Sequence, residues 1–446
     1  MEYLAKPSGQ MDDLREEIFS KLRQFVRIQK QPKEFVPGKT RIHYSGSVYD
    51  DKEVVSMVNA ILDGWFAVSK NGDRFEKGLA EFVGMKHGIL TNSGSSASLA
   101  AISTMCDRMV HGHMRPGDEV ITPAVTFPTT LNPVIQNGLT PVLVDANLST
   151  LNIDEERIES AITDKTKALI LPHTLGNPLD MDNVMELVEK HDLFLLEDTC
   201  DALGSTFAGK NCGSFGDFST YSFYPAHHLT LGEGGTVLVN DDFLAKVCRS
   251  IRDWGRACYC GGDEKNPLGT CNARFSYKVG GHSYDHKYMY TSIGYNLKPT
   301  EIQAAMGIAQ LEKLPQFVEK RKQNFAYYHK RLRDFSDYFI LPEHHPKADP
   351  SWFAFTLTLR DGVPFTRHEL IVFLEQRMIE TRLVFAGNVA LQPAYRHVAF
   401  KKNDDLANST KIMKDTFFIG VYPGLQKPQM EYTVACFEEF LKKHKR

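Results

Sequence analysis

The sequence predicts an α/β protein with a mostly parallel sheet in a large domain, followed by a smaller α+β domain at the C-terminal end. Short, nearly continuous apolar strands alternate with helices from residue 88 to residue 254, which is typical of a parallel sheet covered by helices on both faces. The chain has 446 residues, which is more than one small hydrophobic core accommodates. Beyond a long charged helix the alternation stops, and a strand mixes with amphipathic helices.

Composition excludes several classes of protein. Hydrophobic residues make up 42% and charged residues 24% of the chain, as in ordinary globular proteins, and the net charge of −3 argues against a nucleic-acid partner. No apolar run approaches the length of a membrane span, and the N-terminus lacks the apolar core of a signal peptide. We therefore expect a cytoplasmic protein whose eight cysteines are thiols or metal ligands rather than a disulfide framework.

The pattern divides the chain into three parts. Residues 1–44 form an arm with one amphipathic helix. The large domain spans residues 45–335 and contains a turn-rich, cysteine-bearing insertion at 256–290, and the small domain spans residues 336–446.

Apolar periodicity and turn residues give the elements. The predicted strands of the large domain are Gly88–Asn92, Glu119–Pro123, Thr140–Val144, Ala168–Pro172, Leu193–Glu197, Ser219–Phe223 and Thr236–Asn240. The predicted helices are Asp51–Leu62, one that begins with Phe75–Phe82 after a turn at Asn71-Gly72, Ala97–Met105, Glu155–Ile162, Met181–His191, Phe243–Trp254, Thr300–Leu314 and Glu319–Phe335. In the small domain we expect strand Phe353–Leu359, helix Arg367–Gln376 and a helix after Pro428.

Two segments at strand ends carry candidate binding groups. The loop Ser93-Gly94-Ser95-Ser96 opens a helix, where unpaired amide groups suit a phosphate, although serine and glycine are also ordinary helix caps. The segment Glu197-Asp198-Thr199-Cys200-Asp201 follows another strand, at the edge where ligands bind in such sheets. A carboxylate buried there needs a partner.

A histidine pair lies in the segment Asp217 to Gly235. Pro225 ends a strand, His227 and His228 follow, and Gly232, Gly234 and Gly235 form a flexible loop. The pair is a candidate for proton transfer, or else a structural feature of the turn.

Four cysteines form a possible ligand set. Cys258 and Cys260 are separated by one residue, Cys271 follows after ten more, and Cys200 lies far upstream. Four thiolates suit zinc or a [2Fe-2S] cluster, and the spacing alone does not choose between these and unconnected thiols.

The histidine segment resembles the lysine region of the DegT/DnrJ/EryC1/StrS sugar aminotransferases, which share fold type I of aspartate aminotransferase. Their pattern Ser-Phe-x-Pro-x-Lys-x-x-x-x-Gly-Glu-Gly-Gly is matched from Ser222 to Gly235, except that His227 replaces the lysine that forms a Schiff base with pyridoxal phosphate. Only this alignment favours His227 over His228. The same replacement, with one distant cysteine and a C-x-C pair, is typical of the iron-sulfur sugar 3-dehydrases, such as CDP-4-keto-6-deoxyglucose 3-dehydrase. The resemblance covers residues 45–446.

The resemblance implies roles for individual residues. Gly94, Ser95 and Ser222 would contact the cofactor phosphate, Phe127 would stack on the pyridine ring unless it is a core residue, and Asp201 would also lie at the cofactor. Asp198 would pair with the pyridinium nitrogen. Asn296 would reach the phosphate of a neighbouring subunit, which implies a homodimer. The cluster ligands would be Cys200, Cys258, Cys260 and Cys271; the last is the least secure, because its gap is longer than usual in these enzymes.

The implied reaction is a C3 deoxygenation of a nucleotide-linked 4-keto-6-deoxyhexose, with CDP the favoured nucleotide. Without the lysine, the cofactor would be pyridoxamine phosphate, and His227 would be the general base. The dehydrated adduct would still lack two electrons, which the cluster would pass on from an NAD(P)H-dependent flavin or iron-sulfur reductase. The lost lysine and the added cysteines thus explain each other.

Three alternatives remain open from the sequence. One is a cluster-free dehydratase of the colitose type, which also has histidine for lysine and takes its amine from glutamate. Another is an ordinary aminotransferase with a displaced lysine, such as Lys287 or Lys298. The third is a sugar-nucleotide-binding or zinc-stabilised scaffold without catalysis.

Overall fold

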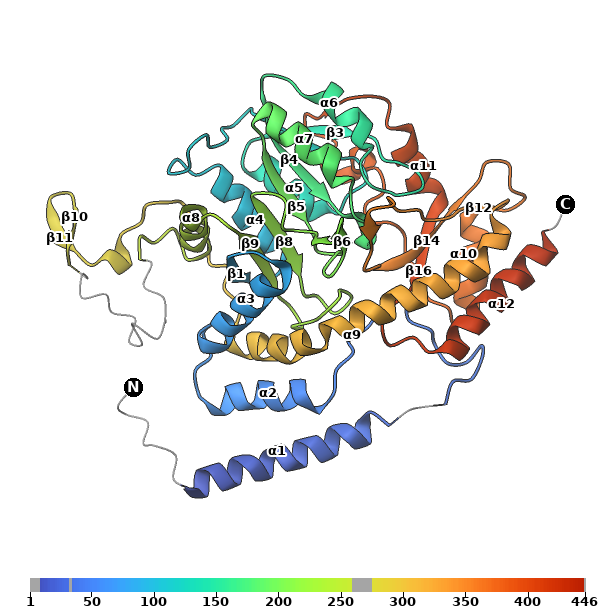
Figure 1. The fold of residues 1–446 in the computed structure, drawn as a ribbon, viewed down its shortest axis with the longest axis horizontal. Coiled ribbons are helices and arrows are strands. Elements are labelled where there is room, and N and C mark those ends of the chain that lie inside the picture. The colour runs from blue at the N-terminus through green and yellow to red at the C-terminus, as the bar shows by residue number, and fades with distance from the viewer. Residues whose placement is uncertain (1–8, 32–33, 259–274, 445–446) are drawn as a thin grey trace.

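The computed structural model describes residues 9–31, 34–258 and 275–444, and a large sheet occupies its centre (Figure 1). The strand order is β1-β9-β8-β5-β4-β2-β3-β15, with β9 antiparallel to both neighbours and the other pairings parallel. The strands are β1 (His87–Thr91), β2 (Glu119–Pro123), β3 (Thr140–Val144), β4 (Thr166–Pro172), β5 (Phe194–Asp198), β8 (Phe218–Ser222), β9 (Gly235–Val239) and β15 (Lys401–Lys402). The predicted mostly parallel sheet is confirmed.

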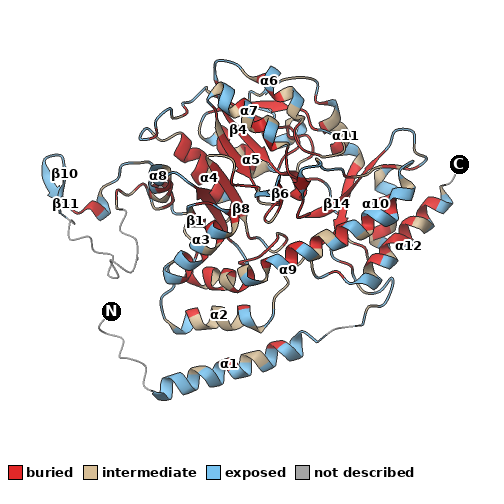
Figure 2. Ribbon diagram, in the orientation of Figure 1, coloured by how far each residue is buried: buried red, intermediate tan, exposed pale blue. Residues whose placement is uncertain are grey.

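Helices cover both faces of this sheet, as β4 illustrates. Ala168 and Ile170 pack in one core with α4, α5 and α8, whereas Leu169 and Leu171 pack in another with α6 and α7, because successive strand residues face opposite sides. The sheet is the most deeply buried part of the chain (Figure 2). The helices of this part are α2 (Asp51–Leu62), α3 (Lys70–Val83), α4 (Gly94–Met105), α5 (Pro128–Gln136), α6 (Ile158–Ala161, after the 3-10 turn Glu155–Arg157), α7 (Met181–His191) and α8 (Asp242–Arg252).

The C-terminal part builds a second, antiparallel sheet in the order β12-β14-β16. It also contributes β13, which pairs with β6, and β15, which extends the edge of the large sheet. The division near residue 335 therefore stays a prediction. The remaining elements are β6 (Thr206–Phe207), β7 (Lys210–Asn211), β10 (Tyr277–Val279), β11 (His282–Tyr284), β12 (Phe339–Ile340), β13 (Ala348–Asp349), β14 (Ala354–Leu359), β16 (Thr416–Gly420), α10 (Arg367–Gln376), α11 (Ala407–Asp415) and α12 (Lys427–Lys443).

A long helix, α9 (Glu301–Leu332), joins the two sheets (Figure 1). The prediction of two helices, Thr300–Leu314 and Glu319–Phe335, was wrong, because the helix continues through Pro315. Leu314, Phe317 and Val318 around the proline are all buried, so tertiary packing offsets the cost of the missing backbone hydrogen bond.

The N-terminal helix α1 (Gly9–Gln29) packs along α2. Its Arg15 donates hydrogen bonds to Asn59 (2.8 Å) and Asp63 (3.0 Å), while most of its surface is exposed (Figure 2). Within the described residues, no helix has the length and apolar character needed to cross a membrane.

The start of α3 differs from its prediction. The expected turn at Asn71-Gly72 is helical, because the carboxylate of Glu301 accepts backbone N–H groups from Ser69 (2.7 Å) and Asn71 (2.6 Å). Glu301 is buried and belongs to α9, so this helix cap comes from a residue far along the chain.

Glu301→Ala should lower the free energy of unfolding by about 1–3 kcal/mol, because it leaves the buried N–H of Asn71 and the N–H of Ser69 without this acceptor. Denaturant titration followed by circular dichroism measures the change. Glu312→Ala is the control on the same helix. Among the described residues its exposed carboxylate pairs only with Lys52, so the loss should stay below about 1 kcal/mol. Equal losses for the two variants would contradict the capping role.

Candidate active site

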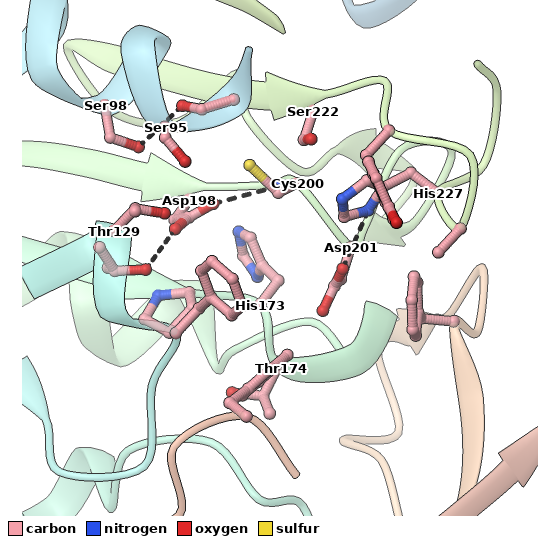
Figure 3. Close-up of a pocket in the computed structure, with 18 of the residues that line it drawn as sticks. Ser95, Ser98, Thr129, His173, Thr174, Asp198, Cys200, Asp201, Ser222 and His227 are labelled. Atoms are coloured by element: carbon pink, nitrogen blue, oxygen red, sulfur yellow. Dashed lines mark hydrogen bonds and ion pairs between the residues drawn. The ribbon is translucent and has the colours of Figure 1, made fainter. Parts of the chain in front are cut away.

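A cavity of about 480 Å³ lies at the carboxyl ends of the parallel strands (Figure 3). Among the residues that line it are eight of the predicted site residues: Gly94, Ser95, Phe127, Asp198, Cys200, Asp201, Ser222 and His227. Asn296 and Cys258 are described but do not line it, and Cys260 and Cys271 fall outside the described residues. Segments distant in the sequence thus meet where parallel-sheet proteins bind ligands.

One wall of the cavity is the N-terminus of α4. Ser93 caps the helix by accepting the Ser96 N–H at 3.1 Å, and the loop packs closely on the end of β8. A Cβ atom on Gly94 would lie 2.4 Å from Cβ of Ser222, so only glycine permits this approach. The free amide groups at the helix start and the Ser222 hydroxyl together form a cradle suited to a phosphate.

Asp198 lies on the cavity floor with only 8% of its surface exposed. Its carboxylate accepts hydrogen bonds from the Thr130 hydroxyl (2.6 Å) and the Cys200 N–H (3.3 Å). No cationic side chain among the described residues pairs with it. A buried carboxylate in this position favours a ligand that carries a positively charged N–H group.

An aromatic group borders the same space. Phe127, at the start of α5, is half exposed and meets Phe385 edge to face, with ring centroids 6.2 Å apart. Phe127 is therefore not a core residue, and its ring is available to a planar ligand.

The two adjacent histidines have different surroundings. The His227 ring points into the cavity, and its Nδ1 lies 3.1 Å from Oδ1 of Asp201 (Figure 3). His228 is buried away from the cavity and donates its Nε2–H to the Ser351 carbonyl at 2.7 Å. Burial, together with the nearby Arg321 cation, lowers the pKa of His228 well below its usual value. Of the pair, only His227 is placed to exchange protons with a ligand.

The sequence reasoning missed His173, which also lines the cavity. Its Nδ1 accepts the Leu179 N–H (3.1 Å), so Nε2 carries the proton and donates it to Glu197 (3.0 Å). His173 directly follows the predicted strand Ala168–Pro172, so the argument from strand ends that selected Asp198 would also have found it.

Arg382 is a second residue that was missed, and it is the cation that the C-terminal part contributes to the cavity. Its guanidinium bonds to Glu380 (2.6 Å) and lies 4.5 Å from the ring centroid of Tyr44. No spacing or motif in the sequence indicates that this arginine reaches the site.

The described residues that line the cavity include no lysine. Lys298 is instead 3.2 Å from Asp253 and lies over the ring of Trp254, and Lys287 is in a short 3-10 turn outside the cavity. The displaced-lysine alternative therefore finds no support within this chain's cavity.

The cysteine set is described only in part. Cys200 lines the cavity, with Sγ 3.8 Å from the Thr220 carbonyl, whereas Cys258 is a half-buried residue beyond the end of α8. The four-thiol site stays a prediction, since Cys260 and Cys271 lie outside the described residues.

Comparison with known proteins identifies relatives over nearly the whole chain. Lipopolysaccharide biosynthesis protein RfbH of Salmonella typhimurium is 46% identical over 96% of this chain and 98% of its own length. The dTDP-4-dehydro-2,6-dideoxy-D-glucose 3-dehydratase of Saccharopolyspora spinosa is 44% identical, over 98% of this chain and 95% of its own. The GDP-4-keto-6-deoxy-D-mannose 3-dehydratase of Yersinia pseudotuberculosis is 35% identical over 77% and 84%.

Comparison with solved structures points to the same kind of protein as the sequence comparison. A mutant of GDP-4-keto-6-deoxymannose-3-dehydratase (ColD) with bound GDP-perosamine superimposes with a TM-score of 0.81 at 27% identity, covering 88% of this chain and 99% of that one. The predicted fold type is confirmed. Because residues 48–438 match the DegT/DnrJ/EryC1/StrS aminotransferase family, and several relatives exceed 30% identity over most of the chain, the protein belongs to that family.

Proposed function

We propose that the protein is a nucleotide-sugar 3-dehydratase that uses pyridoxamine phosphate and a [2Fe-2S] cluster to remove the C3 hydroxyl of a nucleotide-linked 4-keto-6-deoxyhexose. One observation carries the proposal: the imidazole of His227 faces the cavity, and no lysine lines it among the described residues. The sequence resemblance aligns His227 with the Schiff-base lysine of the family. The names of the relatives from Saccharopolyspora and Yersinia support the reaction type, since both are 3-dehydratases of nucleotide-linked sugars.

The donor set fits the cofactor. Gly94, Ser95 and Ser222 would hold its phosphate at the start of α4, and Asp198 would accept the pyridinium N–H. Phe127 would stack on the ring, and Asp201 would also lie at the cofactor. When bound, pyridoxamine phosphate supplies an amine that condenses with the sugar ketone and a ring that accepts electrons. A solved ColD structure that holds a PLP-glutamate geminal diamine supports this class of cofactor.

His227 would then take a proton from the amine-bearing carbon of the cofactor as the C3 hydroxyl departs. The imidazole has the required access to the cavity. The neighbouring His228 does not, because it is buried and committed to the Ser351 carbonyl.

The finer proposal concerns electrons. Cys200, Cys258, Cys260 and Cys271 would hold the cluster, and an NAD(P)H-dependent flavin or iron-sulfur reductase would supply the two electrons that deoxygenation needs. Cys200 supports this reading, because it borders the same cavity as His227 and Asp198. A cluster-free dehydratase of the colitose type is the second candidate, supported by the similarity to solved 3-dehydratase structures whose named cofactor is PLP. Iron and sulfide analysis of anaerobically purified protein separates the two.

A homodimer is part of the proposal. Asn296 does not line the cavity of its own chain and pairs with Asp253 in an isolated β-bridge. This position is compatible with a role at the phosphate site of a partner subunit. CDP stays the predicted nucleotide, whereas the names of the relatives specify dTDP and GDP.

His227→Asn should slow exchange of the cofactor methylene proton with solvent by about 10²- to 10⁴-fold, because the general base is lost while the cofactor contacts remain. Deuterium exchange from labelled pyridoxamine phosphate, followed by mass spectrometry, measures the rate. His397→Asn, an exposed histidine outside the cavity, is the control and should leave the rate unchanged. Exchange at the native rate in His227→Asn would place the base elsewhere.

Cys258→Ala should spare dehydration but stop net reduction, because the cluster would lose one ligand. Incubation with nucleotide 4-keto-6-deoxyhexoses, with and without reductant, gives products that mass spectrometry distinguishes. Cys106→Ala, outside the proposed ligand set, should keep both activities and the native iron content. Reductive turnover by an iron-free Cys258→Ala protein would refute the cluster.

A further inference from the structure

Asp201 and His227 lie next to each other at the cavity although they belong to different loops (Figure 3). Asp201 follows β5 and His227 follows β8, and these strands are parallel neighbours, so their carboxyl ends adjoin. The side chains are 11% and 16% exposed. Within the described part of the chain, Asp201 has no other side-chain partner, and no residue bonds to Nε2 of His227.

Contacts from other segments hold the backbone of both Asp201 and His227. Arg321 of α9 is 1% exposed and donates hydrogen bonds to the carbonyls of His227 (3.0 Å) and Phe353 (3.2 Å). On the other side, Gly176 adopts φ +90°, and a Cβ atom there would lie 3.0 Å from the Asp201 carbonyl. The separation of the two side chains is therefore set by the fold and not by a mobile loop.

The atom that faces Nδ1 decides which ring nitrogen of His227 carries the proton. Oδ1 of Asp201 lies 3.1 Å from Nδ1, and a carboxylate oxygen accepts hydrogen bonds. The buried Arg321 guanidinium is close to the pair, since it bonds to the His227 carbonyl, and it has no carboxylate within ion-pair distance among the described residues. The contact therefore places the imidazole proton on Nδ1.

We infer that Asp201 is a positioning residue that holds the proton of His227 on Nδ1 and leaves Nε2 free to accept a proton from the ligand. When Nε2 becomes protonated, the adjacent carboxylate balances the new positive charge. The 3.1 Å contact is within reach of a hydrogen bond but is not aligned as one in this structure; such contacts are often loose in unliganded sites. The inference deepens the proposed role of His227 and depends on it for its catalytic meaning.

His228 shows the opposite arrangement within the same loop. Its Nε2 carries the proton, bound to the Ser351 carbonyl, and its Nδ1 has no partner among the described residues. The two adjacent rings therefore have different tautomers, which gives the test an internal reference.

The test is the tautomer of His227 in Asp201→Asn. Asparagine keeps the size of the side chain but donates an N–H toward Nδ1, so the proton should move to Nε2. In protein labelled with [¹⁵N]histidine, the two ring-nitrogen resonances of His227 should exchange their protonated and unprotonated shifts. His227→Asn identifies these resonances by their absence. In the loaded enzyme, exchange of the cofactor methylene proton should fall about 10²- to 10⁴-fold.

Two further variants keep the test decisive. Asp201→Glu retains the carboxylate and should preserve the Nδ1–H tautomer. Together with Asp201→Asn, it shows whether the tautomer depends on the carboxylate itself or on any polar side chain at this position. Asp192→Asn makes the same substitution before β5, at the opposite end of the strand and at a left-handed position that asparagine tolerates, and should change nothing. An unchanged tautomer in Asp201→Asn would overturn the inference. Native exchange in His227→Asn would instead refute the proposed base and leave the tautomer result standing.

Discussion

The register between β4, β5 and β8 determines where every candidate catalytic group lies. Pro172 pairs with Asp198, and Asp198 pairs with Thr220, so the three strands end at one level of the sheet. At that edge the chain leaves each strand and enters the segment that carries the candidate groups. These segments are His173 after β4, Asp198 to Asp201 after β5, and Ser222 to His227 after β8. A shift of one residue in either pairing would turn Asp198 to the opposite face, since side chains alternate along a strand. The chemistry of the site is thus a consequence of strand pairing.

Helix α9 complements the sheet by holding the loops that the strands leave open. Its buried polar side chains bond to other segments: Glu301 caps α3, Gln310 accepts the Thr230 N–H of the histidine loop (3.2 Å), and Arg321 bonds to the His227 carbonyl. Asn324 donates to Val421 in the C-terminal part (3.1 Å). Each contact satisfies a backbone group of another segment, so the helix fixes loop geometry in addition to burying apolar side chains.

Local patterns predicted those features that depend on local physics. The bounds of β2, β3 and α7 follow from apolar periodicity and capping residues, and they agree with the prediction to the residue. The start of α3 and the continuity of α9 could not be predicted, since each depends on a partner distant in the sequence. The same distinction between local and distant determinants applies to the residues of the site. Gly94 and Asp198 lie at predictable strand ends, whereas Arg382 enters the cavity through tertiary packing alone.

Replacing the lysine changes what the rest of the cavity must do. A lysine in this position would tether the cofactor covalently and also transfer protons, whereas under the proposed function His227 would transfer protons without a tether. Under the proposed function, retention of the cofactor then depends on the amide groups at the start of α4 and on Asp198. Both are fixed by their neighbours: Gly94 packs against Ser222 with no space for a side chain, and Asp198 accepts a hydrogen bond from Thr130. The imidazole must in turn be held in one tautomer by its surroundings. Under the proposed function, fixed polar contacts replace the covalent tether, and Asp201 would be the residue among them that acts on the base itself.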